Sequence, residues 1–247
     1  MIHRRTAVAL LSASPLLLSG CGGGAEAAPS RSGDDRPVQV TASPTPESNS
    51  PQPSGIPGLG PKTTAAIPGR AEQVVVARGR GRNSPVSSVA LYERDDDVWQ
   101  TGATWPAHNG RDGWSEHHMA GDLRSPVGVY GLTDAGGLLA DPGSRLPYHH
   151  SYGFTSPGTG FEGEPLEGSF DYVIAINYNR EPGTSPLDWT RPMGAGRGGG
   201  VWLHVDHGGP THACVSVAKA HMKELLRTLD PDRHPVVVMG HADWLAR

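Results

Sequence analysis

The chain has 247 residues, of which 34 are Gly and 23 are Pro, roughly twice the usual share of these two residue types. Its 21 basic and 25 acidic residues give a formal net charge of −4, which argues against a nucleic-acid partner because such proteins usually carry a basic patch or stripe. Beyond the N-terminus, no apolar run approaches the ~20 residues that a membrane-spanning helix needs. These features exclude nucleic-acid-binding and multi-spanning membrane proteins.

The first 20 residues have the features of a secretory signal peptide. A basic start is followed by an apolar stretch over residues 7–18, which is too short to span a membrane. The stretch ends in Leu18-Ser19-Gly20-Cys21, which is similar to the bacterial lipobox, where the cysteine thiol carries diacylglycerol. We therefore expect residues 1–20 to be a lipoprotein signal peptide and Cys21 to be the lipid attachment residue. An incidental cysteine after an ordinary signal is the alternative, and the export route, general or twin-arginine, stays open.

A Pro-, Gly- and Ser-rich segment follows over residues 21–72. The first aromatic residue of the chain is Tyr92, and a segment of this composition cannot bury enough apolar surface to offset its ordering entropy. It predicts a disordered, extended tether that carries a folded domain from the outer face of the cytoplasmic membrane toward the cell wall. Residues 73–247 are numerous enough for one globular domain with a sizeable core.

Six short apolar runs bounded by turn residues predict β-strands. They cover residues 73–77, 87–92, 127–131, 172–177, 201–205 and 235–239. Gly- and Pro-rich connections, such as residues 193–200, separate them. Short strands with many turns are typical of a β-sandwich or a related β-rich fold.

One segment near the C-terminus has clean helical spacing. Its apolar residues recur at i, i+4, i+7, i+8 and i+11, at Ala218, Met222, Leu225, Leu226 and Leu229. Ser216 is the candidate N-cap, and Pro231 fits the end of the helix. The expected fold class is therefore mostly β with one helix in the C-terminal region.

The chain has only two cysteines, Cys21 and Cys214. If Cys21 is lipidated, Cys214 stays unpaired outside the cytoplasm, where an odd cysteine indicates intermolecular pairing or a reactive thiol. A buried structural thiol is a third interpretation. Cys214 comes just before the predicted helix, and the positive end of the helix dipole and a nearby imidazole would lower the thiol pKa. A thiolate with an adjacent base is what nucleophilic acyl transfer requires.

Three histidines, His204, His207 and His212, are candidates for that base. In a strand over residues 201–206, His204 shares a face with Trp202, which could support its ring. His207 lies beside two glycines in an expected mobile turn, which is a poor platform for a group that must stay within hydrogen-bond reach. The strand position therefore favours His204.

At this point the sequence resembles a known family. His204, followed by Thr211-His212-Ala213-Cys214-Val215, resembles the active-site signature of the L,D-transpeptidase catalytic domain, also called the YkuD domain, in its short-spacer branch. Further segments match the family's pattern in order, at residues 121–130, 146–148, 171–179 and 229–236. The resemblance covers roughly residues 87–240.

The resemblance implies a β-sandwich-like, cofactor-free enzyme domain that uses peptidoglycan stem peptides as donor and acceptor. In it, Cys214 is the nucleophile, His204 is the base, and backbone N–H groups around Ala213 and Cys214 form the oxyanion hole, with Thr211 and His212 beside it. The thiolate would attack the third stem residue and expel the terminal D-Ala. The thioester would then pass to an amine, giving a 3→3 cross-link, or to water, giving L,D-carboxypeptidation. We expect a monomer.

Two departures from the family pattern leave other classes of function open. His212 and Ala213 stand where the short-spacer branch has Ala and Gly, and a Cβ at residue 213 would cost about 1–2 kcal/mol if the position needs a positive φ. Ala213 therefore favours, as an alternative, a non-catalytic wall-binding lipoprotein. A zinc-dependent peptidoglycan hydrolase is the other alternative, although the spacing matches no zinc motif. Its possible ligands would be His204, Asp206, His207, His212 and Cys214.

Overall fold

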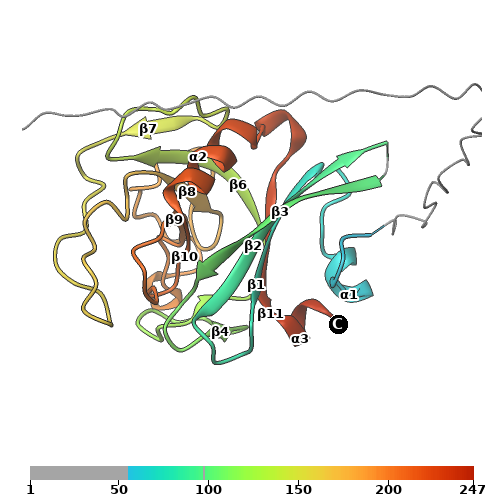
Figure 1. The fold of residues 1–247 in the computed structure, drawn as a ribbon, viewed down its shortest axis with the longest axis horizontal. Coiled ribbons are helices and arrows are strands. Elements are labelled where there is room, and N and C mark those ends of the chain that lie inside the picture. The colour runs from blue at the N-terminus through green and yellow to red at the C-terminus, as the bar shows by residue number, and fades with distance from the viewer. Residues whose placement is uncertain (1–54, 97) are drawn as a thin grey trace, which may run out of the picture. The chain divides into compact units, whose positions relative to one another are not determined.

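Nine strands of the described chain form one large sheet that closes on itself (Figure 1). The computed structural model describes residues 55–96 and 98–247, so the expected signal peptide, Cys21 and most of the expected tether lie outside the described residues. The strands of the large sheet are β1 (Gln73–Gly79), β2 (Val86–Asp95), β3 (Val98–His108), β6 (Gly128–Gly137), β7 (Tyr148–His150), β8 (Val173–Ile176), β9 (Trp202–Val205), β10 (Val215–Val217) and β11 (Val236–His241).

The order of the strands is β11-β1-β2-β3-β10-β9-β8-β6-β7, and β11 also pairs with β6. This second pairing closes a ring of 8 strands, to which β7 adds at β6. Two short strands, β4 (Trp114–Ser115) and β5 (Ser125–Pro126), form a separate pair. The mostly β class expected from the sequence is confirmed.

All six strands expected from apolar runs are present, as β1, β2, β6, β8, β9 and β11. The apolar-run criterion misses β3, because Gly102 and Pro106 interrupt it and most of its side chains are exposed. It also misses β10, which has only 3 residues. In β9 the expected alternation holds, since Leu203 and Val205 are buried in the core while Trp202 and His204 line a cavity.

The expected helix is α2 (Lys219–Thr228), which lies beside β9 and buries Met222, Leu225 and Leu226 (Figure 1). The expected N-cap is wrong. Ser216 lies inside β10, paired with His204 of β9, and its hydroxyl donates to Asp206 Oδ1 at 2.6 Å. Ala218 occupies the N-cap position without a side-chain cap. The remaining helices are short: α1 (Pro61–Ala65), α3 (Ala242–Leu245), and the single 3₁₀ turns η1 (Ala195–Arg197) and η2 (Pro231–Arg233).

Helix α1 joins the N-terminal end of the described chain to its C-terminus. Gly60 N donates to Leu245 O at 2.8 Å, and Lys62 N donates to Arg247 O at 3.0 Å. The side chain of Thr63 donates to Trp244 O at 3.2 Å, and Ile56 is buried in the core. The packed unit therefore begins upstream of residue 73, where composition places the boundary.

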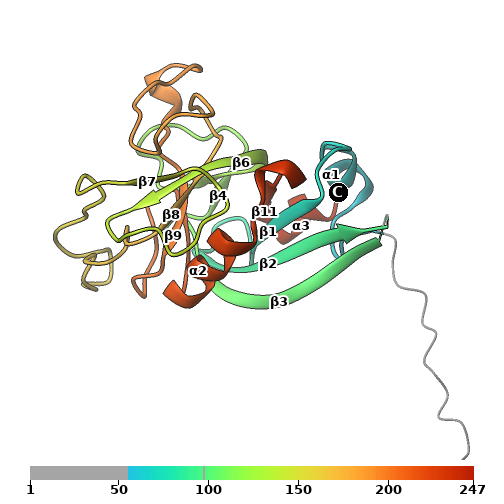
Figure 2. The same ribbon diagram turned by 90° about the horizontal axis from the view of Figure 1, so that it is seen from above.

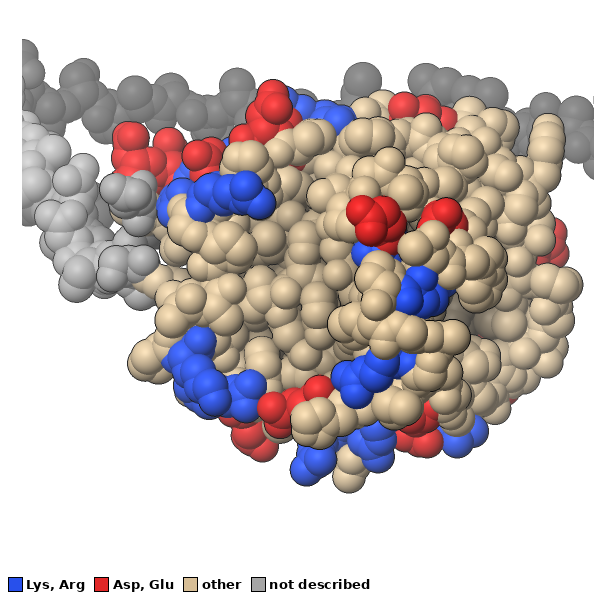
Figure 3. Space-filling model, turned by 180° about the vertical axis from the view of Figure 1, so that it is seen from behind, with Lys and Arg blue, Asp and Glu red and all other residues tan. Residues whose placement is uncertain are grey.

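The connections after β7 and β8 are long, and they extend from the side of the barrel opposite α1 and the C-terminus (Figures 1 and 2). They cover residues 151–172 and 177–201. On the face shown in Figure 3, basic and acidic side chains are interspersed around a largely uncharged depression, so this face has no extended patch of one sign. No described helix has the length and apolar character needed to span a bilayer.

Candidate functional site

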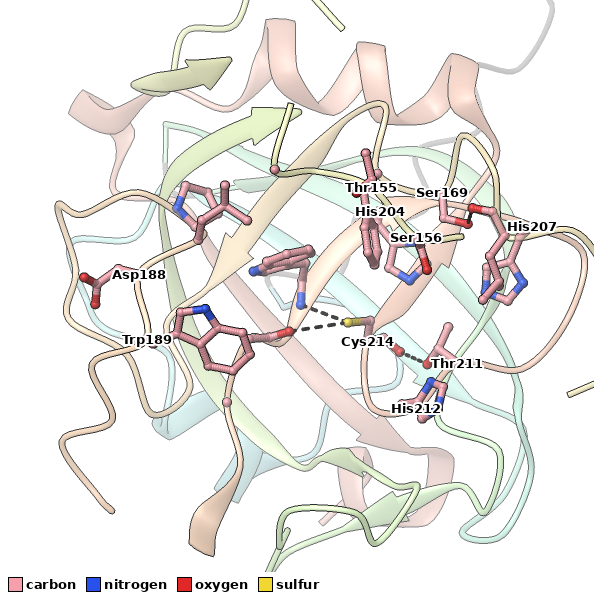
Figure 4. Close-up of a pocket in the computed structure, with 18 of the residues that line it drawn as sticks. Thr155, Ser156, Ser169, Asp188, Trp189, His204, His207, Thr211, His212 and Cys214 are labelled. Carbon is pink, nitrogen blue, oxygen red and sulfur yellow. Dashed lines mark hydrogen bonds between the residues drawn. The ribbon is translucent and has the colours of Figure 1, made fainter. Parts of the chain in front are cut away.

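A cavity of about 390 Å³ lies between the two long connections, β9 and the turn before β10 (Figure 4). Cys214, His204, His207, Thr211 and His212 all line it. In Figure 4, Trp189 and Asp188 lie on one side of Cys214, while His207 and Ser169 lie on the opposite side. The structure thus brings Cys214, all three candidate bases and Thr211 to one cavity.

Cys214 lies directly before β10, where its thiol contacts the backbone that leads into β9. The Trp202 N–H donates to Sγ at 3.4 Å, and the thiol donates to Gly200 O at 3.7 Å. Burial raises the pKa of the thiol to about 11, and the hydrogen bond from Trp202 opposes this rise. The expectation of a lowered thiol pKa is wrong, because α2 begins only at Lys219 and desolvation disfavours the thiolate.

His204 is a buried residue of β9, with 3% of its surface exposed. Its Nδ1 lies 2.9 Å from Val205 O, which assigns the Nδ1 proton and leaves Nε2 as an acceptor. Burial lowers the pKa of His204 to about 4, so the imidazole is neutral at pH 7. Phe170 packs edge-on against both Trp202 and His204, so it is Phe170 that supports the His204 ring.

The pKa of the Cys214 thiol is about 11 and that of His204 is about 4. In the resting site, the equilibrium therefore favours the proton on sulfur over the proton on His204 by several orders of magnitude. Among the described residues, the thiol bonds only to the backbone of Trp202 and Gly200 and not to His204. The pair is therefore a neutral thiol and a neutral imidazole. The thiolate–imidazolium ion pair is therefore disfavoured in the resting site.

The turn before β10 is held by two hydroxyl groups. Thr211 Oγ1 donates to Cys214 O at 2.7 Å, and the buried Ser125 Oγ donates to the same oxygen at 3.2 Å. Within the described chain, the backbone N–H groups of His212, Ala213 and Cys214 donate to no protein acceptor. His212 and Cys214 line the cavity, and successive free N–H groups of this kind can bind a developing oxyanion.

Ala213 does not adopt a positive φ. The expected cost of a Cβ at this position therefore does not arise, and the side chain packs against the core instead. His212 is exposed, and its ring lies 4.8 Å from that of Phe161. The departures from the family pattern at residues 212 and 213 thus leave the backbone of the turn unstrained.

The expectation that His207 lies on a mobile turn is wrong. Its side chain is 5% exposed, its Nδ1 lies 3.2 Å from Glu164 Oε1, and its ring stacks on His204 at 5.8 Å between centroids. Desolvation raises the Glu164 pKa, but backbone amides and His207 more than offset this, so the net shift is downward. His207 therefore gives the His204 ring a second aromatic contact, in addition to that of Phe170.

The five possible zinc ligands do not converge. Among residues 55–96 and 98–247, no group of three or more His, Cys, Asp or Glu side chains could hold a metal ion. Asp206 instead accepts from His108 Nδ1 at 2.8 Å and from Ser216, while His204 is bonded to Val205 O. Desolvation raises the pKa of Asp206, but these hydrogen bonds outweigh it and hold the pKa at about 2.

The His108–Asp206 pair predicts a pH-dependent contribution to stability. The hydrogen bond to Asp206 raises the pKa of His108 in the folded protein. Protonated His108 therefore stabilises the fold fully below its unfolded pKa of about 6.5. This stabilisation is lost as the pH rises through the pKa of His108 in the folded protein. We expect Asp206→Asn to lower the free energy of unfolding by about 1–3 kcal/mol at pH 5.5 and by less at pH 8.5. Urea unfolding of both proteins at each pH measures this, with His108→Gln as a control for the same pair. An equal loss at both pH values would contradict it.

Several residues of the site carry no recognisable signal in the sequence. Gly200 contributes a carbonyl and Trp202 an N–H, which any residue type can supply. Ser125 lies in a segment that matches the family pattern, but its contact with the Cys214 carbonyl spans 89 positions. The pairing of Glu164 with His207 likewise depends on how the connection after β7 folds back.

No family model and no curated protein matches the chain. Solved structures similar to it include Bd1075 of Bdellovibrio bacteriovorus (17% identity, TM-score 0.37) and the helical cell shape determining protein Pgp2 from Campylobacter jejuni (16%, 0.37). A third is a fused Zn-dependent amidase/peptidase/peptidoglycan-binding domain-containing protein from Clostridium acetobutylicum (12%, 0.31). Each alignment covers 68% of this chain but 47%, 46% and 51% of those chains, so this chain spans about half of their length. Similarity at this level assigns no activity.

Proposed function

We propose that the protein is a lipid-anchored cysteine acyltransferase that acts on peptidoglycan stem peptides, as an L,D-transpeptidase or L,D-carboxypeptidase. One observation carries the proposal: a thiol, a buried neutral imidazole and two residues with free backbone N–H groups, His212 and Cys214, line the same cavity, with the free N–H of Ala213 between them. Acyl transfer needs this set, namely a nucleophile, a base and donors for the oxyanion. The sequence resemblance supports the choice of peptidoglycan as substrate.

The reaction would begin with a proton moving from the Cys214 thiol to Nε2 of His204 as sulfur attacks the carbonyl carbon of the third stem residue. The free N–H groups of residues 212–214 would then stabilise the tetrahedral oxyanion; removing one such donor from an enzyme typically costs about 3–4 kcal/mol. His204 would return the proton to the departing D-Ala amine. An acceptor amine or water would resolve the thioester by the same route in reverse.

The non-catalytic alternative depends mainly on Ala213. Since Ala213 has no positive φ, this residue gives no structural reason for inactivity. The zinc alternative predicts a stoichiometric metal ion in purified protein, which metal analysis would detect.

Intact mass spectrometry after exposure to a carbapenem tests the proposed function, because members of the family that the sequence resembles are acylated by these compounds on the cysteine. We expect one acyl adduct per chain, located at Cys214 by peptide mapping. Release of D-Ala from a tetrapeptide stem gives an independent readout. A protein that forms no adduct and releases no D-Ala would contradict the proposal.

Membrane anchoring through Cys21 makes a separate prediction. We expect the wild-type protein, expressed in a bacterium that processes lipoproteins, to partition into the detergent phase, and Cys21→Ala to partition into the aqueous phase. The physical reason is that the diacylglycerol chains contribute about 0.8 kcal/mol for each buried CH₂ group. Phase separation followed by immunoblotting measures the difference. If both proteins stay in the aqueous phase, Cys21 carries no lipid.

A further inference from the structure

Two cavities share one wall, which is formed by Trp189, Arg191, Gly199 and His212. The first cavity is the one at Cys214. The second, of about 370 Å³, lies on the other side of this wall and also reaches Ala213. Arg191 is the only Lys or Arg among the residues that line either cavity. Asp188 is the only Asp or Glu in the same two linings, so Arg191 is the one Lys or Arg there that can pair with an anionic ligand.

The position of Arg191 is fixed by its own connection. Its Nη1 donates to Asp188 O at 3.0 Å and to Thr190 O at 2.9 Å, and the guanidinium stacks on the Trp189 ring at 5.0 Å. On its other side it lies against Gly199 and Gly200, where a Cβ on Gly199 would collide with Nε. Both glycines have positive φ. The two glycines thus let the guanidinium lie directly on the backbone.

Arg191 has no anionic partner within the described chain. No Asp or Glu oxygen lies within 4.0 Å of its nitrogens, and Nε and Nη2 donate to no protein acceptor. Asp188 is nearby, but its Oδ1 accepts from Thr190 N at 2.8 Å. The guanidinium is also partly buried, and the Asp188 carboxylate attracts it only from beyond ion-pair distance. Such a cation is suited to bind a carboxylate from a ligand.

The position of Arg191 relative to Cys214 indicates which carboxylate of a peptide it would bind. The guanidinium lies next to Gly200, where an added Cβ would be 3.5 Å from Nη2, and the Gly200 carbonyl accepts the hydrogen bond from the Cys214 thiol. The Arg191 guanidinium and Sγ of Cys214 therefore both lie next to Gly200. In a peptide cleaved before its last residue, the terminal carboxylate is separated from the attacked carbonyl carbon by only the amide nitrogen and one Cα. A carboxylate bound at Arg191 would thus place the scissile bond beside the sulfur.

We propose that Arg191 binds the free C-terminal carboxylate of the donor stem peptide, so that the site selects tetrapeptide donors whose leaving residue ends in a free acid. This inference rests on the proposed function for the identity of the peptide. It assigns Arg191 as a specificity-determining residue that contacts the leaving group, and it makes Trp189 the support that holds the guanidinium at the shared wall.

Peptide binding to the full mature chain carrying Cys214→Ala tests the inference without turnover. Three tetrapeptide stems are compared by isothermal titration calorimetry: the free acid, its C-terminal amide, and a peptide with a free C-terminus whose internal carboxyl groups are amidated. We expect both peptides with a free terminus to bind about 10- to 100-fold more tightly than the C-terminal amide, the usual effect of one charged hydrogen bond. Adding Arg191→Gln should remove this preference. Adding Arg191→Lys should keep part of it, because the charge remains but the bidentate geometry is lost.

Arg197→Gln is the matched control. Arg197 lies on the same connection, contacts Met119 Sδ, and lines neither cavity, so this change should leave the preference intact. The inference would be overturned by equal binding of acid and amide, or by a preference that survives Arg191→Gln. It would also be overturned by a preference that follows the internal carboxyl groups, or by no binding of any stem. If the acid is preferred through Arg191 but wild type neither forms an acyl-enzyme nor releases D-Ala, the proposed acyl transfer fails while the carboxylate site stands.

Discussion

Cys214→Ala is expected to abolish acyl-enzyme formation and to leave the fold nearly unchanged. The described chain contains no other cysteine, so Cys214 supplies the only thiol in the cavity, and the hydroxyl groups of Ser169 and Thr211, which also line it, donate to backbone carbonyls. The thiol makes only two long contacts, to the Trp202 N–H and the Gly200 carbonyl. Their loss should lower the free energy of unfolding by about 1 kcal/mol. Carbapenem adduct formation and D-Ala release should both fall to background.

Thermal unfolding of Cys214→Ala provides the control, since a melting temperature close to that of wild type excludes misfolding as the cause. Cys214→Ser is the matched variant, because it keeps a hydrogen-bonding group at the same position while replacing the nucleophile. We expect Cys214→Ser to be acylated no faster than the general-base variant His204→Gln. A carbapenem adduct of normal yield on folded Cys214→Ala would show that acylation occurs elsewhere in the chain.

The second large effect is expected at His204. His204→Gln should lower the rate of Cys214 acylation by about 10²–10⁴-fold, the usual range for loss of a general base. A proton acceptor is required here because burial raises the thiol pKa to about 11, so almost no thiolate forms spontaneously at pH 7. His207→Ala should reduce the rate only a few-fold, by removing the ring that stacks on His204. His212→Ala should be intermediate, because His212 lines the cavity but is exposed.

The pH profile of acylation separates this assignment from the alternatives. Burial lowers the pKa of His204 to about 4, so the neutral base is present above that pH and is lost as pH falls through it. The rate should therefore stay nearly flat from pH 5 to pH 9 and decline near pH 4. Timed mass spectrometry of each variant, with circular dichroism to confirm folding, measures these rates. A normal rate in folded His204→Gln, with collapse in His207→Ala, would move the base to His207.

The strand containing His204 and the helix α2 could be predicted because their signals are local. Alternation along β9 places Leu203 in the core and His204 on the cavity side, and the 3.6-residue period marks Met222 and Leu225 as buried. Each of these features depends only on neighbours within one element. The core face of the barrel and the wall of the cavity that holds His204 were therefore accessible from the sequence.

The electrostatics of the site were not accessible in this way. The raised thiol pKa of Cys214 results from burial beneath connections that are distant in sequence, whereas the local rule considered only the helix that follows. Ser216 has the residue type of an N-cap, but pairing of β10 with β9 recruits it as a strand residue bonded to Asp206. Glu164 lies beside His207 although 43 positions separate them in the sequence. The periodicity of a strand or helix cannot predict a contact over that separation. Tertiary contacts between connections decide these properties.

The attachment of α1 to the C-terminal residues has a mechanical consequence. If the membrane anchor holds the protein through residue 55, any pull enters the folded unit at α1 and passes into α3 and the neighbouring strands β1 and β11. The connections that form the cavity project from the opposite side of the barrel (Figures 1 and 2). They lie at the far end of the folded unit from α1, so a pull between an anchor at Cys21 and a stem peptide held at Cys214 would load the backbone hydrogen bonds of Gly60 and Lys62 at one end and the cavity connections at the other.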